Sequence, residues 1–244
     1  MNCDGAKALV TGAARRVGRA VALELASAGC DVAVHYGNSA READEVVALI
    51  EECGRKAVAV RGDLTDAASP KRIVEAAVAA LGGLDVLVNN AAVFDSDPED
   101  GFDAGHWERT FQVNAFAPAA LIDAAAEALA HGGAGKVVNF CDISADRPWK
   151  RYHAYCASKA ALISLTQSYA RLLAPRVQVN GVSPGIAIFP EDYDEALKAK
   201  LVERVPLKRA GTPEEMARMV RFLVEQGDYI TGQIINVDGG RSIV

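Results

Sequence analysis

Three side chains in the segment CDISADRPWKRYHAYCASK (141–159) have the chemistry needed for proton transfer. Tyr155 and Lys159 lie four residues apart in a predicted helix, so both face the same side of that helix. A tyrosine beside an ammonium group suits a proton donor, because the positive charge favours the phenolate and lowers the tyrosine pKa. Asp142, thirteen residues before the tyrosine, adds a carboxyl group to the pair.

Strands and helices that alternate along the chain must position these residues. Short β-branched runs predict strands at 7–12, 31–36, 56–64, 85–91, 136–141, 177–184 and 234–240. Helical patterns lie between them at 16–29, 39–53, 68–82, 104–131, 151–174 and 212–226. This alternation predicts an α/β fold with a parallel sheet of about seven strands and helices on both faces. With 244 residues, 50% of them hydrophobic, we expect one domain over residues 1–244.

Composition excludes several classes of partner. The net charge of −6 argues against nucleic acid. The N-terminus resembles no secretory signal, and we find no apolar run long enough to span a bilayer, so we expect no membrane partner. Five scattered cysteines without a CxxC pair predict reduced thiols in a cytoplasmic protein. Four histidines without metal-ligand spacing predict no metal site.

A glycine-containing loop, VTGAARRVGRA (10–20), joins the first predicted strand to the first helix. Gly12 permits a tight turn and Gly18 permits close packing of the helix on the strand. The N–H groups at the start of the helix suit a pyrophosphate, so the loop predicts a dinucleotide site. The alternative is an ordinary turn and helix cap.

The end of the second predicted strand indicates which dinucleotide is bound. An acid there would hold the ribose 2′-hydroxyl of NAD, but the sequence is HYGNSA (35–40), and Asp31 lies at the wrong end of the strand. Cations and polar side chains suit a 2′-phosphate instead, and we therefore predict NADPH/NADP+. The candidates are Arg15, Arg16, Asn38, Ser39 and Arg41, with ordinary surface residues as the alternative.

Seven motifs along the chain together resemble the short-chain dehydrogenase/reductase family. They are TGAARRVG (11–18), GDL (62–64), NNAA (89–92), QVNA (112–115), YCASK (155–159), SPG (183–185) and NVDGG (236–240). The resemblance covers nearly the whole chain and implies a Rossmann-type, doubly wound sheet, a nicotinamide cofactor, a small-molecule substrate and a homotetramer.

The resemblance also assigns roles to single residues. It implies that Tyr155 donates a proton, that Lys159 binds the nicotinamide ribose and lowers the pKa of Tyr155, and that Asn114 anchors a water in a proton relay. It further implies a set of cofactor contacts at Gly12, Arg15, Arg16, Val17, Gly18, His35, Asn38, Ser39, Asp63, Leu64, Asn90, Ala91, Ala92, Pro184, Gly185 and Ile186.

Three departures from the common family pattern narrow the resemblance. Arg16 replaces a glycine, Ala92 replaces a glycine, and Asp142 stands where a catalytic serine is usual. All three are similar to the pteridine reductase and dihydromonapterin reductase branch. That branch often has an arginine at the position of Asn38, which weakens the prediction of 2′-phosphate binding unless Arg15 or Arg41 compensates.

An acid at position 142 suits some reductions better than others. An ionised carboxylate would repel the oxyanion that forms when a ketone is reduced. When a C=N bond of a pterin is reduced, a ring nitrogen needs a proton, which a carboxyl of raised pKa can supply directly or through Tyr155. We therefore predict a pteridine-like substrate in contact with Arg16, Phe94, Asp142 and Tyr155. The alternative for Asp142 is a purely structural hydrogen bond.

Two other functions remain open at this point. The first is reduction of a 3-oxoacyl thioester or another carbonyl, and the second is a non-catalytic NADP-binding sensor on the same fold. The acidic segment 94–108 is expected to be a solvated loop, and 185–211 a lid over the substrate. Trp149 and His153 fit either the site or an oligomer contact.

Overall fold

The computed structural model describes residues 1–190 and 193–244, which are organised around a sheet of seven parallel strands in the order β3-β2-β1-β4-β5-β6-β7. The strands are β1 Lys7–Val10, β2 Asp31–Tyr36, β3 Ala57–Arg61, β4 Val86–Asn89, β5 Gly135–Phe140, β6 Val177–Pro184 and β7 Ile234–Val237. All seven lie within or next to the predicted runs. The predicted Rossmann-type parallel sheet is therefore confirmed.

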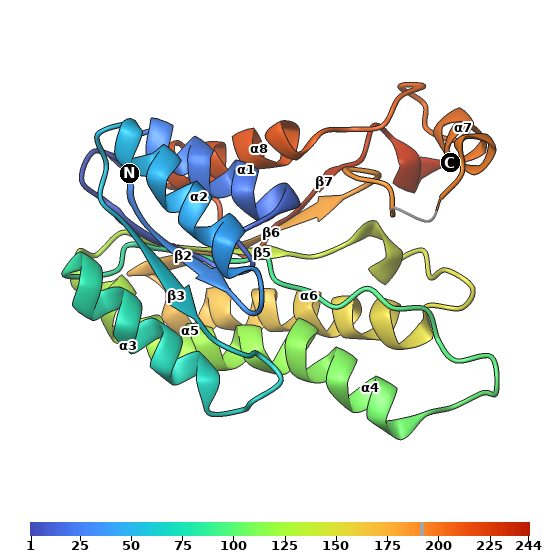
Figure 1. Cartoon of the computed structure of the whole chain (residues 1–244), viewed down its shortest axis with the longest axis horizontal. Helices are drawn as coiled ribbons and strands as arrows, with labels where there is room; N and C mark the ends of the chain where they lie inside the picture. Colours follow the sequence, from blue (N-terminus) through green and yellow to red (C-terminus); the bar gives the residue numbers. More distant parts are fainter. Residues whose placement is uncertain (191–192) are drawn as a thin grey trace.

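Helices cover both faces of the sheet (Figure 1). One face carries α1 Arg16–Ser27, α2 Ala40–Glu52 and α8 Pro213–Glu225, and the other carries α3 Ser69–Leu81, α4 Ala104–Phe111, α5 Ala117–His131 and α6 His153–Leu173. An apolar core lies on each side of the sheet. Because both faces are covered, every residue of β4 and β5 is buried, which explains the apolar runs VLV in β4 and VV in β5.

The strand order reverses at β1, whose neighbours are β2 on one side and β4 on the other. In open α/β sheets a crevice forms at such a point, beyond the carboxyl ends of the strands, and ligands bind there. The loops that follow β1 and β4 carry the motifs TGAARRVG and NNAA. The topology therefore brings the two motifs together.

A π-helical turn, Gln112–Phe116, joins α4 to α5 without a break. The resulting helix, Ala104–His131, is long and apolar enough to cross a membrane by length and composition, which corrects the expectation that no run of this kind exists. Its apolar residues have another explanation, because 56% of the tested window is buried and Leu121, Ile122 and Ala125 belong to the core. This helix packs against the sheet.

One helix of the structure was not predicted. Helix α7, Glu195–Glu203, lies in the segment 185–211, which lacks a regular pattern. None of its residues is fully buried, so no apolar stripe marks it in the sequence. Residues 191–192 of the expected lid lie outside the described residues, and the lid stays a prediction.

Candidate active site

The loop after β1 is shaped by two glycines. Gly12 has a φ of +62°, in the left-handed region that favours glycine. A Cβ on Gly18 would lie 2.2 Å from the Gly12 carbonyl oxygen, so helix α1 can approach the loop only with glycine there. Asn90, after β4, donates from its Nδ2 to the carbonyl oxygens of Thr11 (2.8 Å) and Gly12 (3.3 Å). The loop is thus fixed by the neighbouring strand end.

His35, at the end of β2, holds the same loop through hydrogen bonds of its ring. Its Nδ1 accepts a hydrogen bond from the Gly12 N–H at 3.2 Å, and its Nε2 lies 3.2 Å from the Gly62 carbonyl oxygen. These partners require a neutral ring with the proton on Nε2. Burial lowers the pKa of His35 to about 4, against an opposing effect of the Gly62 carbonyl. His35 therefore connects the ends of β1, β2 and β3 as an uncharged group.

We predict that the neutral His35 makes stability depend on pH. The pKa is about 4 in the folded protein and 6.5 in an unperturbed histidine, so the contribution is complete above pH 6.5 and is lost as the pH falls towards 4. The expected loss is about 3 kcal/mol of unfolding free energy. Urea unfolding of the wild type and of His35→Gln at pH 7.5 and 4.5 measures it, because glutamine can keep both hydrogen bonds without titrating. An unchanged pH dependence in His35→Gln would refute the prediction, and the exposed His131→Gln is the control.

Two adjoining cavities lie along the carboxyl edge of the sheet. The larger, of about 1370 Å³, brings together Gly12, Arg15, Arg16, Val17, Gly18, Asn90, Ala91, Ala92, Phe94, Asp142, Tyr155, Pro184, Gly185 and Ile186. The smaller, of about 1020 Å³, is lined by His35, Asn38, Asp63, Leu64, Ala91 and Ala92 among others. Ala91 and Ala92 line both cavities. Of the predicted cofactor contacts, Ser39 lines neither, and it stands at the N-cap of α2.

This pair of cavities fits a dinucleotide. The first turn of α1 carries no acidic residue, and Arg15 and Arg16 stand where the helix begins. A helix N-terminus with two cations and no acid favours a phosphate group. Arg16 adopts a φ of +53°, which is strained for a residue with a side chain. The arginine therefore occupies a backbone position that glycine would adopt without strain.

Asp142 and Tyr155 line the larger cavity, and Lys159, which lines neither cavity, lies next to the Tyr155 ring. The Tyr155 hydroxyl donates to Asp142 Oδ2 at 2.8 Å. The other carboxyl oxygen, Oδ1, accepts the Ser144 N–H at 2.7 Å and caps the short 3-10 helix Ile143–Ala145. Lys159 Nζ donates to the Phe140 carbonyl oxygen at 2.7 Å and lies 5.7 Å from the centre of the Tyr155 ring. Asp142 therefore has a structural contact and a contact to the predicted proton donor.

The electrostatics of this group differ from the expectation in one respect. Burial raises the pKa of Asp142, and the Ser144 N–H, the Tyr155 hydroxyl and Lys159 offset only part of that effect. The predicted lowering of the Tyr155 pKa is wrong for this structure. Burial and then the charge of Asp142 raise that pKa well above its ordinary value. The Lys159 ammonium, 5.7 Å from the centre of the ring, does not reverse this shift.

Asn114 is buried in the π-helical turn and lines neither cavity. Its Oδ1 accepts the Val93 N–H at 2.8 Å, and its Nδ2 donates to the Val93 carbonyl (2.9 Å) and to Ser158 Oγ (3.0 Å). The side chain thus connects the loop after β4 to the helix that carries Tyr155 and Lys159. Its role in a water relay stays a prediction.

Aromatic rings form one wall of the larger cavity. Phe94 stacks on Tyr152 at 4.7 Å and meets the edge of Tyr155 at 4.8 Å. Trp149, which the sequence could not assign, lines this cavity and lies 6.1 Å from Phe94 with the two rings perpendicular. Phe94 keeps 38% of its surface exposed. This wall suits a flat, conjugated substrate.

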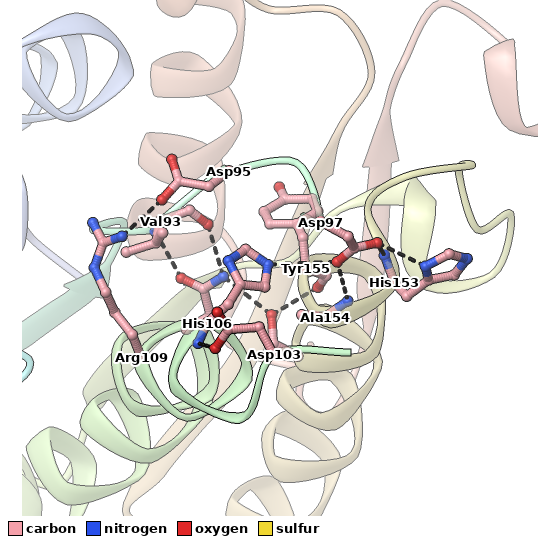
Figure 2. A network of polar contacts seen from close by, with 11 residues as sticks. Val93, Asp95, Asp97, Asp103, His106, Arg109, His153, Ala154 and Tyr155 are labelled. Atoms are coloured by element: carbon pink, nitrogen blue, oxygen red, sulfur yellow. Dashed lines mark hydrogen bonds and ion pairs between the residues drawn. The ribbon is translucent and has the colours of Figure 1, made fainter. Parts of the chain in front are cut away.

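Asp97 fixes the start of helix α6 and shows that the segment 94–108 is not simply a solvated loop. Figure 2 shows its carboxylate between the rings of His106 and His153. Its oxygens accept the backbone N–H groups of His153 (2.6 Å) and Ala154 (3.3 Å), and its Oδ2 lies 2.7 Å from His153 Nδ1. Burial raises the pKa of Asp97, but these contacts outweigh it and hold the pKa below its usual value. His153 thus helps to hold the start of helix α6, which carries Tyr155, in place.

We predict that Asp97→Ala loosens the helix that carries Tyr155. Loss of a helix cap costs about 1–2 kcal/mol, and we expect kcat to fall several-fold because Tyr155 follows the capped residue Ala154. Thermal unfolding and steady-state kinetics measure both effects. Asp100→Ala, an exposed acid of the same loop, is the matched control and should change neither. Equal behaviour of the two variants would contradict the prediction.

Comparisons with known proteins agree with this arrangement. A family model described as Enoyl-(Acyl carrier protein) reductase matches residues 12–242. The short-chain dehydrogenase/reductase FrzI of Cladobotryum sp is 37% identical over 96% of this chain and 94% of its own length. The 3-oxoacyl-[acyl-carrier-protein] reductase FabG of Staphylococcus aureus is 34% identical, with 96% of each chain covered.

The fold of this chain is also similar to that of a solved structure. The FolM Alternative dihydrofolate reductase 1 from Brucella canis, complexed with NADP, superposes with a TM-score of 0.93. It is 34% identical in sequence, and the match covers 100% of this chain and 96% of that one.

Proposed function

Since the chain belongs to the short-chain dehydrogenase/reductase family and is an NADP-dependent oxidoreductase, we propose that it reduces a ring C=N bond of a pteridine-like substrate. The observation that carries this proposal is the 2.8 Å hydrogen bond between Tyr155 and Asp142 on the wall of the larger cavity. The carboxyl group of Asp142 has a raised pKa and lines this cavity, which supports a role as proton donor to the substrate.

The chemistry at this carboxyl favours a ring nitrogen over a ketone oxygen. NADPH, when bound, supplies a hydride to the ring carbon. The neighbouring nitrogen then needs one proton, which Asp142 donates directly or through the Tyr155 hydroxyl. Because burial raises the pKa of Asp142, the carboxyl holds this proton closer to neutral pH than an exposed aspartate would. Once Asp142 has lost its proton, the carboxylate would repel the negative oxygen of a reduced ketone more strongly than a neutral ring nitrogen.

The remaining side chains of the cavity support a flat substrate. Phe94 and Trp149 offer ring surfaces on which a flat substrate can stack. Arg16 belongs to the loop proposed to bind the cofactor, and it also lines this cavity, where its guanidinium can contact the substrate. Lys159 has donors beyond the one that binds Phe140, and these suit the nicotinamide ribose. Asn114 holds the loop that carries Phe94 against the helix that carries Tyr155.

The relatives support two substrate classes. The neighbour described as an alternative dihydrofolate reductase supports a pterin ring. The FabG relatives support the alternative, a 3-oxoacyl thioester, to the same degree. We favour the pterin because of Asp142. A sensor without activity is the weakest alternative, since it would need no proton donor beside the cofactor.

Assembly and location follow as further expectations. The homotetramer rests on the family, and Phe102, Phe116 and Leu172, whose side chains are 78%, 56% and 69% exposed, are candidate contacts between subunits. All five cysteines are free thiols, which supports a cytoplasmic protein.

A substrate panel tests the proposed function. NADPH oxidation is followed with dihydrobiopterin, dihydrofolate and an acetoacetyl thioester in parallel assays. We expect kcat/KM for at least one of the two pterins to exceed that for the thioester by tenfold or more. Activity on the thioester alone would replace the proposal by its alternative, and NADPH binding without turnover of any substrate would favour the sensor.

A further inference from the structure

Two arginines from distant parts of the sequence meet on the wall of the larger cavity. Arg204 directly follows helix α7, and Arg241 begins the short 3-10 helix Arg241–Ile243 near the C-terminus. Both line the cavity that also contains Asp142 and Tyr155. Helix α7 and the C-terminus lie at the same end of the molecule (Figure 1). Besides the arginines of the cofactor loop, the cavity wall includes Arg109, Lys150, Arg204 and Arg241, and the last two lie close enough for their charges to interact.

The guanidinium of Arg241 has a fixed position. It lies over the Trp149 ring, 5.3 Å from its centre, and Trp149 in turn lies beside Phe94. Burial and the nearby charge of Arg204 lower the pKa of Arg241, while Asp142 opposes them. Arg241 thus stands between the aromatic wall, the catalytic acid and a second cation. A guanidinium over an aromatic ring still has N–H groups at its edge that can bind an anion.

Neither cation is neutralised by an ion pair within residues 1–190 and 193–244. Other arginines of this region are paired, since Arg209 binds Glu215 through both terminal nitrogens and Arg109 binds Asp95. Asp238, the acid just before Arg241 in sequence, is occupied by the N–H groups of Gly240 and Ser242. Two neighbouring cations that form no ion pair in the described chain are complementary to an anionic ligand.

We infer that Arg204 and Arg241 form a subsite for an anionic substituent, a carboxylate or a phosphate, on the side chain of the substrate. This inference rests on the proposed function and extends it. The ring lies against Phe94 and Trp149 with its reducible bond at Asp142 and Tyr155, and the side chain leads outward to the two guanidinium groups. The enzyme accordingly prefers pterins whose substituent ends in a negative charge over neutral pterins.

Kinetics with three pterins test this subsite. Dihydrobiopterin is neutral in its side chain, dihydrofolate carries carboxylates, and dihydroneopterin monophosphate carries a phosphate. We expect Arg204→Gln and Arg241→Gln each to raise KM for the favoured anionic pterin about tenfold, as the loss of one charged hydrogen bond would. KM for dihydrobiopterin should stay within twofold. The anionic pterin with the larger effect identifies carboxylate or phosphate as the ligand.

Control variants separate charge from folding and from catalysis. Arg204→Lys should restore most of the affinity, and Arg218→Gln, an exposed arginine on α8 that lines neither cavity, should leave all constants unchanged. Equal changes of KM for the neutral and the anionic pterins, or no change for either, would overturn the subsite while leaving the proposed function intact. No turnover of any pterin by the wild type would overturn the proposed function and the subsite with it.

Discussion

Asp142→Asn is expected to lower kcat for dihydropterin reduction by roughly 100- to 1000-fold, within the range that a general acid contributes. Asparagine has nearly the same shape and can still accept the Ser144 N–H, so the short helix after it should keep its cap. It has no carboxyl proton to give to a ring nitrogen. Steady-state kinetics with saturating NADPH measure the change, and KM for NADPH should stay within about threefold because Asp142 is assigned to the substrate.

Stability provides the control for this variant. Burial raises the pKa of Asp142 in the folded protein. In the unfolded chain the same carboxyl ionises at its ordinary pKa of about 3.9, and hence at a lower pH than in the folded protein. The folded state therefore loses stability as the pH rises from there to the folded pKa. Asparagine removes this cost, and the melting temperature at pH 7 should equal or exceed that of the wild type. A lower melting temperature would assign the loss of activity to misfolding.

The pH profile of the same pair is a second readout. An acid must be protonated to donate, so kcat of the wild type should fall as the pH rises through the raised pKa of Asp142. Asp142→Asn should lack this descending limb. If the variant kept the limb and at least a tenth of the wild-type rate, Asp142 would be a structural residue only.

Tyr155→Phe is the second change with a large expected effect. Phenylalanine preserves the ring contacts with Phe94 and Lys159 but removes the hydroxyl that donates to Asp142. We expect kcat to fall by roughly 100- to 10,000-fold for every substrate, because the hydroxyl passes the proton and orients the carboxyl. Unfolding free energy should change by about 1 kcal/mol, the contribution of one hydrogen bond.

The two variants differ in a way that separates direct from relayed proton transfer. If Asp142 protonates the ring nitrogen directly, Tyr155→Phe retains more activity than Asp142→Asn, since the acid itself remains. If the proton passes through the hydroxyl, both variants fall to the same level, and the double variant falls no further. Rates measured on all three variants with one pterin decide between these routes.

The sheet could be predicted from the sequence because buried parallel strands contain short runs of β-branched residues. β4 and β5 are buried at every position, and their predicted boundaries agree with the structure to within two residues. Helix α7 escaped prediction because it has no fully buried residue and hence no apolar stripe. The range of the helix Ala104–His131 was predicted, but its mean hydropathy, which is high enough for a membrane span, was underestimated.

Most of the predicted site residues gather in space because their motifs lie at the ends of parallel strands, which share one edge of the sheet, whereas the motifs QVNA and YCASK lie on helices. Contacts between segments that lie far apart in the chain could not be predicted, because no sequence motif marks them. Asp97 reaches helix α6 from a loop 56 residues earlier in the chain, and its neighbours in sequence are acids that look solvated. The sign of the Tyr155 pKa shift also depends on burial, which the four-residue spacing to Lys159 does not reveal.

Tracing the hydride tests the central claim most directly. NADPH with deuterium at both C4 positions of the nicotinamide is incubated with the enzyme and an equimolar mixture of a dihydropterin and an acetoacetyl thioester, and the products are analysed by mass spectrometry and NMR. We predict one deuterium on a ring carbon of the tetrahydropterin, next to the nitrogen that gains the proton. Deuterium only on the hydroxyl-bearing carbon of the reduced thioester, with the pterin unlabelled, would contradict the account.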